Sequence, residues 1–293
     1  MTHDLHTALQ ALPPALTQAL TPELTDRFEG VISAERFTQL QSLSGLESDP
    51  LMLTLLPLAA AYAITPVSHF RVGAIAQGQS GALYFGANLE LVQQNLFHSV
   101  HGEQAAISNA WRHGESGIRA MVVNASPCGH CRQFMNELQH ANQLQVVLPD
   151  QGRQALSHYL PYAFGPKDLG VESGLLAHMD HGLQHPSRDP MMIAAVAEAN
   201  ASYAPYSSSP AAVVLQSDDE RLFCGRYAEN AAFNPSLPPM QMALSAMAMS
   251  GVPFHRIRRA LLVQKAQGQI DHRLASVAAL GAVSDVALQT EAV

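Results

Sequence analysis

The chain of 293 residues contains little cysteine, little charge and no long apolar run. Three cysteines are too few for a disulfide framework, which indicates a reducing compartment, and the N-terminal residues lack the pattern of a secretory signal. Charged residues make up 14% of the chain, and the net charge is −8. The one short basic run, at 254–259, is typical of a solvated helix or strand face. No apolar stretch is long enough to cross a bilayer. We therefore expect a cytoplasmic protein with neither nucleic acid nor membrane as partner.

Apolar residues, by contrast, are plentiful. They make up 47% of the chain, which predicts a well-buried globular protein rather than a disordered one. The length allows two domains, or one domain with an extension.

Residues that bind metals gather in two short motifs, His101-Gly102-Glu103 and Pro127-Cys128-Gly129-His130-Cys131. Imidazole and thiolate are common Zn²⁺ ligands, and a catalytic site keeps a fourth position for water beside three protein ligands. The spacing H-x-E…P-C-x-x-C is a known signature of zinc deaminases, in which the glutamate is an acid/base and not a ligand. We therefore predict one Zn²⁺ per chain, held by His101, Cys128 and Cys131, with Glu103 as the catalytic proton carrier.

Two other interpretations of the cysteine motif stay open at this point. Cys-Gly-His-Cys is also a thiol–disulfide exchange motif, although Ser126 and Pro127 replace the expected aromatic residue and Glu103 would then have no role. A closed structural zinc site would need a fourth ligand, for which His98 and His113 are candidates.

The apolar pattern predicts a layered α/β arrangement. Leucines at helical spacing indicate short helices within residues 1–46, and Thr21-Pro22 and Asp49-Pro50 each resemble a helix start. Further along the chain, the patterns favour the order α-β-β-α-β-α-β, with the metal-binding motifs at helix starts. The expected elements are a helix at about 50–62 kinked at Pro57, strands at 72–76, 83–85, 121–123 and 145–148, and two helices carrying His101 and Cys128.

An internal repeat appears when the sequence is shifted by 139 residues without a gap. The coincident pairs are Pro66 and Pro205, Ser68 and Ser207, Gly86 and Gly225, Glu90 and Glu229, and Asn95 and Asn234. The same shift places Met240 on His101 and Met242 on Glu103, and no second C-x-x-C follows. The second half is therefore expected to keep the fold without the zinc ligands.

The sequence resembles the cytidine deaminases, in the larger two-domain form found in some bacteria. The likeness covers nearly the whole chain and is carried, besides the metal motifs, by residues 70–74, 86–90, 163–169 and 227–235. It implies a cytidine-deaminase-like three-layer α-β-α domain that is duplicated, behind a small N-terminal helical extension. We expect an extension at 1–48, a catalytic domain at 49–150, a connector at 151–189 and a degenerate second domain at 190–293.

The resemblance also implies a reaction and a binding site. The expected reaction is zinc-dependent hydrolysis of cytidine and deoxycytidine to uridine and deoxyuridine with release of ammonia, a step of pyrimidine salvage. Asn88 and Glu90 would bind the ribose hydroxyls, Phe70 would pack against the pyrimidine, and Gly102 would contribute backbone groups. The protein would be a homodimer in which Phe233 reaches the partner's active site.

Two positions depart from the family pattern. Gly102 stands where the family usually has alanine, and Ala125 stands where large relatives carry an aromatic residue.

Three alternative functions remain. They are a nucleotide or nucleic-acid deaminase, a thiol–disulfide oxidoreductase, and a binding module with an inactive zinc site.

Overall fold

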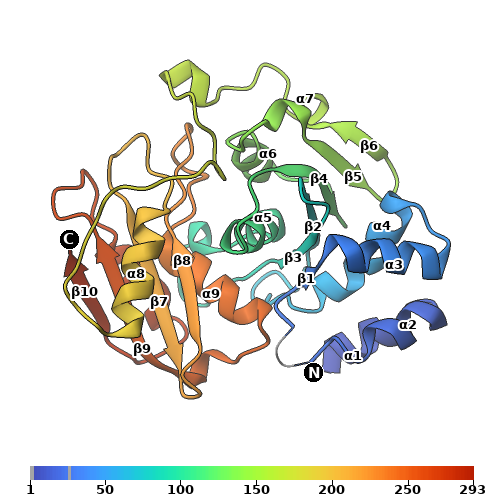
Figure 1. Ribbon diagram of the computed structural model, residues 1–293, viewed down its shortest axis with the longest axis horizontal. Coiled ribbons are helices and arrows are strands. Elements are labelled where there is room, and N and C mark those ends of the chain that lie inside the picture. Colours follow the sequence, from blue (N-terminus) through green and yellow to red (C-terminus); the bar gives the residue numbers. More distant parts are fainter. Residues whose placement is uncertain (1–2, 26–27) are drawn as a thin grey trace.

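A six-stranded sheet organises the first half of the chain. The computed structural model describes residues 3–25 and 28–293 (Figure 1). The strands lie in the order β1-β3-β2-β4-β5-β6, and β4 and β5 are parallel while the other neighbours are antiparallel. Their bounds are β1 Val31–Ile32, β2 Gly73–Gly78, β3 Leu83–Ala87, β4 Ile118–Val123, β5 Gln145–Leu148 and β6 Gly152–Ala155.

Helices cover both faces of this sheet. The N-terminal helices bury their leucines against one face, in a core that includes Ile75, Phe85 and Val122 of the sheet. On the other face, α5 packs against β2 and β3, and α6 lies beside it. The helices of this half are α1 His3–Gln10, α2 Pro14–Leu20, α3 Ala34–Ser44, α4 Ser48–Ala60, α5 Gly102–Arg112, α6 Gly129–Met135 and α7 Leu156–Tyr159. The predicted three-layer domain is therefore confirmed.

The second half repeats this arrangement with four strands. Their order, β10-β9-β7-β8, matches β5-β4-β2-β3, and the parallel and antiparallel pairings match as well. One face of the sheet is covered by α8, and α9 on the other face packs against α5, so the two halves meet through these helices (Figure 1). The bounds are α8 Pro190–Asn200, β7 Ala211–Ser217, β8 Leu222–Arg226, α9 Pro239–Met249, β9 Ile257–Gln264, α10 Arg273–Gly281 and β10 Leu288–Ala292.

Four short 3₁₀ helices complete the secondary structure of the described residues. They are η1 Leu96–His98, η2 Ala141–Gln143, η3 Pro166–Leu169 and η4 Phe254–Arg256.

The repeat keeps an offset of 139 residues in β2, β3 and β4 but not in the central helices. A ladder irregularity follows Gln77 in β2 and Gln216 in β7, positions that are 139 residues apart. Leu89 and Ala228 are also 139 apart, but their bridge partners Val100 and Leu237 are only 137 apart. The second half is thus two residues shorter between these bridges.

The sequence alignment of the metal motif was therefore wrong by two residues. The glycine of β3, Gly86, lies against α5 at Ala106, and its counterpart Gly225 lies against α9 at Ala243, which is again an offset of 137. With this offset, Pro238 corresponds to His101 and Met240 to Glu103. The conclusion that the second half has no zinc ligands holds with the corrected pairing.

Local predictions near the N-terminus were partly wrong. Thr21 ends α2 instead of starting a helix, and α4 begins at Ser48 with Glu47 as N-cap, so Asp49 lies inside its first turn. The extension also adds the short edge strand β1, which pairs with β3. The helix around Pro57 is present and ends at Ala60.

Within the described residues, every helix is too short or too polar to cross a lipid bilayer.

Candidate zinc and nucleoside site

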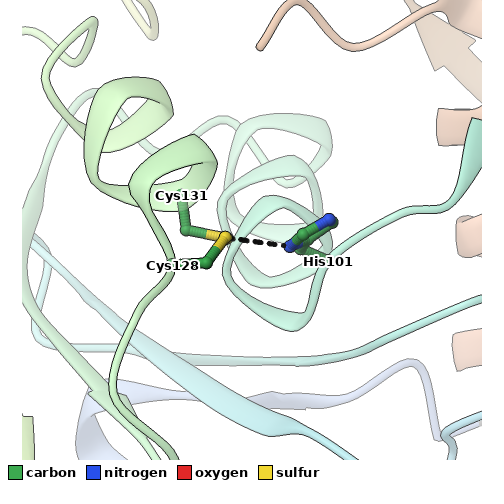
Figure 2. Close-up of side chains that lie close together, drawn as sticks. All are labelled: His101, Cys128 and Cys131. Carbon is green, nitrogen blue, oxygen red and sulfur yellow. Dashed lines mark hydrogen bonds between the residues drawn. The ribbon is translucent and has the colours of Figure 1, made fainter. Parts of the chain in front are cut away.

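The three predicted metal ligands meet at the starts of two neighbouring helices. His101 is the N-cap residue of α5, Cys128 is the N-cap residue of α6, and Cys131 lies in the first turn of α6. His101 Nδ1 lies 3.4 Å from Cys128 Sγ and 3.3 Å from Cys131 Sγ, and the two sulfurs are 3.6 Å apart (Figure 2). The motifs, 27 residues apart in sequence, thus form one cluster.

This cluster fits a zinc ion. Tetrahedral Zn²⁺ with bonds of about 2.3 Å to sulfur and about 2.0 Å to nitrogen holds its ligand atoms roughly 3.5–3.8 Å apart. The observed separations of 3.3–3.6 Å are close to these values. Two thiolates and one neutral imidazole also balance the charge of the ion.

The fourth position of the cluster is not taken by a side chain of the described residues. The group of possible ligands contains His101, Cys128 and Cys131 alone, and both cysteines are free thiols rather than a disulfide. The two candidates for a fourth ligand point elsewhere: His98 contacts Gln241, and His113 contacts Asn109 and Glu29. A closed structural zinc site is therefore not supported.

Hydrogen bonds between the ligands already favour one thiolate. Contacts from Cys131 and His101 lower the pKa of the Cys128 thiol to about 3, despite its partial burial. The bond to Cys128, together with burial, raises the pKa of Cys131 well above its usual value. The two pKa shifts are opposite in direction, and Zn²⁺ needs both sulfurs as thiolates, so metal binding is accompanied by proton release.

Glu103 lies beside the cluster and outside the ligand group. It is the second residue of α5, and its side chain is buried, with 4% of its surface exposed. Burial raises the pKa of its carboxyl group, against hydrogen bonds from its own backbone N–H and from Cys131. A buried carboxyl group beside an open ligand position is able to hold and release a proton there.

His130, between the two cysteines, packs on the ligand histidine instead of binding the metal. Its ring stacks on that of His101 with the centroids 4.7 Å apart and the planes 19° apart. The stack places one face of the ligand ring against a second imidazole.

A cavity of about 400 Å³ opens next to Glu103. All four of the predicted substrate-binding residues line it, together with His101 and Glu103. The lining residues are Val67, Ser68, Phe70, Val72, Asn88, Glu90, Leu96, Ser99, Val100, His101, Gly102 and Glu103. Phe233 and Ala125 are not among them.

Glu90 is held by three donors from one turn. Its Oε2 accepts hydrogen bonds from the backbone N–H groups of Val67 and Ser68, at 2.9 and 3.0 Å, and its Oε1 accepts one from the Ser68 hydroxyl. Burial alone would raise the pKa of Glu90, but these bonds outweigh it and lower the pKa. The carboxylate is thus ionised and keeps acceptor capacity for one more donor. Ser68 was not predicted to support the site, although its match with Ser207 in the repeat was a signal.

Asn88 ties two segments of the cavity wall together. Its Oδ1 accepts a hydrogen bond from Val72 N–H at 2.9 Å, and its Nδ2 donates to the Phe70 carbonyl at 3.0 Å. Phe70 itself is 58% exposed, so it is a wall of the cavity and not a core aromatic residue.

Gly102 begins α5 where the backbone passes close to Val72. A Cβ atom at position 102 would lie 2.9 Å from Cγ1 of Val72, so an alanine there needs a small shift of one methyl group.

Comparison with known proteins identifies the family. Two regions, residues 46–147 and 156–277, match models described as the cytidine and deoxycytidylate deaminase zinc-binding region. A cytidine deaminase of Shewanella loihica is 54% identical over 95% of this chain and 94% of its own, and one of Shewanella sediminis is 53% identical over the same shares. The chain belongs to the cytidine and deoxycytidylate deaminase family. The resemblance inferred from the motifs is thereby confirmed, and the cluster of His101, Cys128 and Cys131 lies in the matched zinc-binding region.

Solved structures of smaller deaminases align with part of the chain. A cytidine deaminase from Mycobacterium tuberculosis is 28% identical, with a TM-score of 0.37, and covers 41% of this chain and 99% of its own. One from Burkholderia pseudomallei is 26% identical, with a TM-score of 0.36, and covers 40% of this chain and all of its own.

Proposed function

We propose that this family member deaminates cytidine and deoxycytidine, adding water and releasing uridine or deoxyuridine and ammonia. The observation that carries the proposal is a three-ligand cluster with an open fourth position at the end of a nucleoside-sized cavity. The names of the relatives, which match over nearly their whole length, support the same reaction.

The cavity favours a nucleoside over a nucleotide or a nucleic acid. Among its lining residues there is neither lysine nor arginine, and two of them are glutamates. A phosphate group is normally met by Arg, Lys or a cluster of backbone N–H groups. The sugar hydroxyls would instead meet Glu90 and Asn88, and Phe70 would pack against the ring.

In the proposed reaction, His101, Cys128 and Cys131 hold Zn²⁺. When bound, the ion lowers the pKa of a coordinated water to about 7 and so supplies a nucleophile at neutral pH. Glu103 takes a proton from the attacking water, delivers it to N3 of the ring, and later helps the amine at C4 leave as ammonia. Its burial keeps these proton transfers away from bulk water.

Replacing Glu103 with alanine tests this assignment. The variant should retain about one zinc per chain, because Glu103 is not a ligand, while cytidine turnover falls at least about 10²–10⁴-fold, the usual worth of acid/base catalysis. Metal content by atomic absorption and the loss of cytidine's ultraviolet absorbance measure the two effects. Normal turnover, or loss of the zinc, would refute the assigned role.

We also propose a homodimer whose partner closes the cavity. Two large apolar side chains that line the cavity are exposed, Phe70 at 58% and Leu96 at 74%, and Phe97, which follows Leu96 in the chain, is also 74% exposed. Phe233, on the second half, is 67% exposed, and its backbone has a positive φ of 62°. Such side chains are normally covered by an interface, which makes Phe233 of the partner subunit a candidate cover.

The domain limits of 1–48, 49–150, 151–189 and 190–293 remain part of this proposal. The presence of free cysteines supports a reducing compartment, the cytoplasm.

A further inference from the structure

We propose that the second half of the chain positions the zinc ligand His101 through two buried glutamines, Gln104 and Gln241. Nε2 of Gln104 donates to the Pro235 carbonyl at 3.1 Å, and Nε2 of Gln241 lies 2.9 Å from Nδ1 of His98. Both glutamine side chains are buried, each with 1% of the residue exposed.

The two contacts are related by the internal repeat. With the offset of 137 that relates α5 to α9, Gln104 corresponds to Gln241 and His98 corresponds to Pro235. Each glutamine occupies the third position of its helix and reaches the segment that precedes the helix of the other half. The two contacts are therefore reciprocal. The segment before α5 ends in the zinc ligand His101, whereas the segment before α9 ends in Pro238.

The first contact reaches His101 through its backbone. Oε1 of Gln104 accepts the hydrogen bond of His101 N–H at 3.2 Å, so one amide binds both the ligand residue and the Pro235 carbonyl. An amide fixed at both ends has little freedom, and the His101 backbone shares that restraint. The second half thus limits where the imidazole can lie relative to the two sulfurs.

The second contact holds the segment in front of His101. His98 ends η1, and Leu96 of the same turn lines the cavity. With Gln241 donating, Nδ1 of His98 is the acceptor, so its ring is the tautomer protonated on Nε2. Movement of this turn would displace His101, which follows three residues later.

The stability of the fold does not by itself explain why a glutamine stands at position 241. Its Oε1 is buried and has no hydrogen-bond partner within the described residues. An unsatisfied buried carbonyl destabilises a fold, whereas an apolar pair in place of Gln241 and His98 would be close to neutral. A residue that costs stability is expected where it serves a function.

The variant Gln241→Met tests the proposal on the zinc-loaded protein. Methionine keeps the length of the side chain and the helix preference but removes the donor. We expect zinc release to a chromogenic chelator to become about tenfold faster, as when groups that orient a ligand are lost. The visible absorption bands of the Co²⁺-substituted protein should shift, because they report the geometry of the ligands. Neither readout needs a substrate, so both stand apart from the proposed deamination.

His98 supplies the second half of the test. His98→Leu should match Gln241→Met, whereas His98→Gln, whose carbonyl can accept from Gln241, should restore slow release. The double variant His98→Leu/Gln241→Met should be no worse than either single one. His98 and Gln241 lie on opposite sides of one contact. If Gln241→Met does not fold, the comparison of His98→Leu with His98→Gln therefore still tests the proposal.

Met242→Leu is the matched control, since Met242 is equally buried on α9 and has an apolar side chain. It should leave zinc release and the Co²⁺ bands unchanged. The proposal is overturned if Gln241→Met and His98→Leu release zinc at the parent rate, or if they change both readouts no more than Met242→Leu does.

Discussion

Glu90 and Glu229 are one carboxylate arrangement present twice in the chain. Each accepts hydrogen bonds from two backbone N–H groups and one serine hydroxyl of a single turn, which contains Ser68 and precedes β2 in the first half and contains Ser207 and precedes β7 in the second. Only Glu90 lies in the cavity beside the zinc cluster. The common hydrogen bonds indicate that the carboxylate supports the turn in both halves, so a role in binding must be separated from a role in folding.

The pair makes that separation possible. Glu90→Gln keeps an oxygen for the backbone donors but loses the charged acceptor for a ribose hydroxyl. A hydrogen bond to a charged group contributes about 1.5–3 kcal/mol, so KM for cytidine should rise about 10- to 100-fold. The control Glu229→Gln should cause a similar change in melting temperature and leave KM unaltered. Equal KM values for the two variants would contradict ribose binding by Glu90.

At the level of elements, α6, the helix that carries Cys128 and Cys131, is tied to the second half of the chain by a residue just after its end. Glu137, two residues after α6, is fully buried and accepts hydrogen bonds from the hydroxyls of Tyr203 and Tyr206 and from Ala231 N–H. All three donors belong to the second half of the chain. Burial raises the pKa of Glu137, against the effect of these bonds.

This raised pKa predicts a pH-dependent stability. The carboxyl group has a higher pKa in the folded protein than its usual 4.5, so folding favours the protonated form. That contribution is fully present below pH 4.5 and is lost as the pH rises through the folded pKa. Glu137→Gln cannot ionise, so its stability relative to the parent should increase from pH 4.5 towards neutrality. Urea unfolding at several pH values measures the difference, and a constant difference would contradict the prediction.

Short elements and insertions explain where sequence analysis failed. The main strands and α5 were predicted because their apolar patterns are local and long enough. Strand β1 has two residues and exists through its pairing with β3, which no local pattern reveals. The two-residue offset of α9 was hidden because the strands before and after it keep the offset of 139.

The same division applies to the candidate site. The zinc cluster was predictable because its three ligands lie in two short sequence motifs whose residue types and spacing are typical of zinc sites. The contacts of Gln104 with Pro235 and of Gln241 with His98 were not, since these partners lie more than a hundred residues away and are set by the packing of α5 on α9. Contacts between the halves depend on tertiary structure.

For the complete protein, the proposed dimer predicts that two inactive variants complement each other. Glu103→Ala lacks the proton carrier, and Phe233→Ala lacks the side chain that would close the partner's cavity. A mixed dimer contains one site with both groups intact, so equal mixing after dissociation and reassociation should restore about a quarter of the parent activity. Sedimentation should give a dimer throughout. Mixtures no more active than the average of the two variants would contradict closure by Phe233.

Zinc-dependent release of ammonia from cytidine decides whether the cluster of His101, Cys128 and Cys131 is a catalytic centre. Purified protein is stripped of metal with a chelator, titrated with Zn²⁺, and assayed at each step with cytidine. We predict no turnover without the ion and a linear gain that stops at about one zinc per chain, as expected for a single three-ligand site. Turnover that persists in the stripped protein, or its absence at one zinc per chain, would contradict the account.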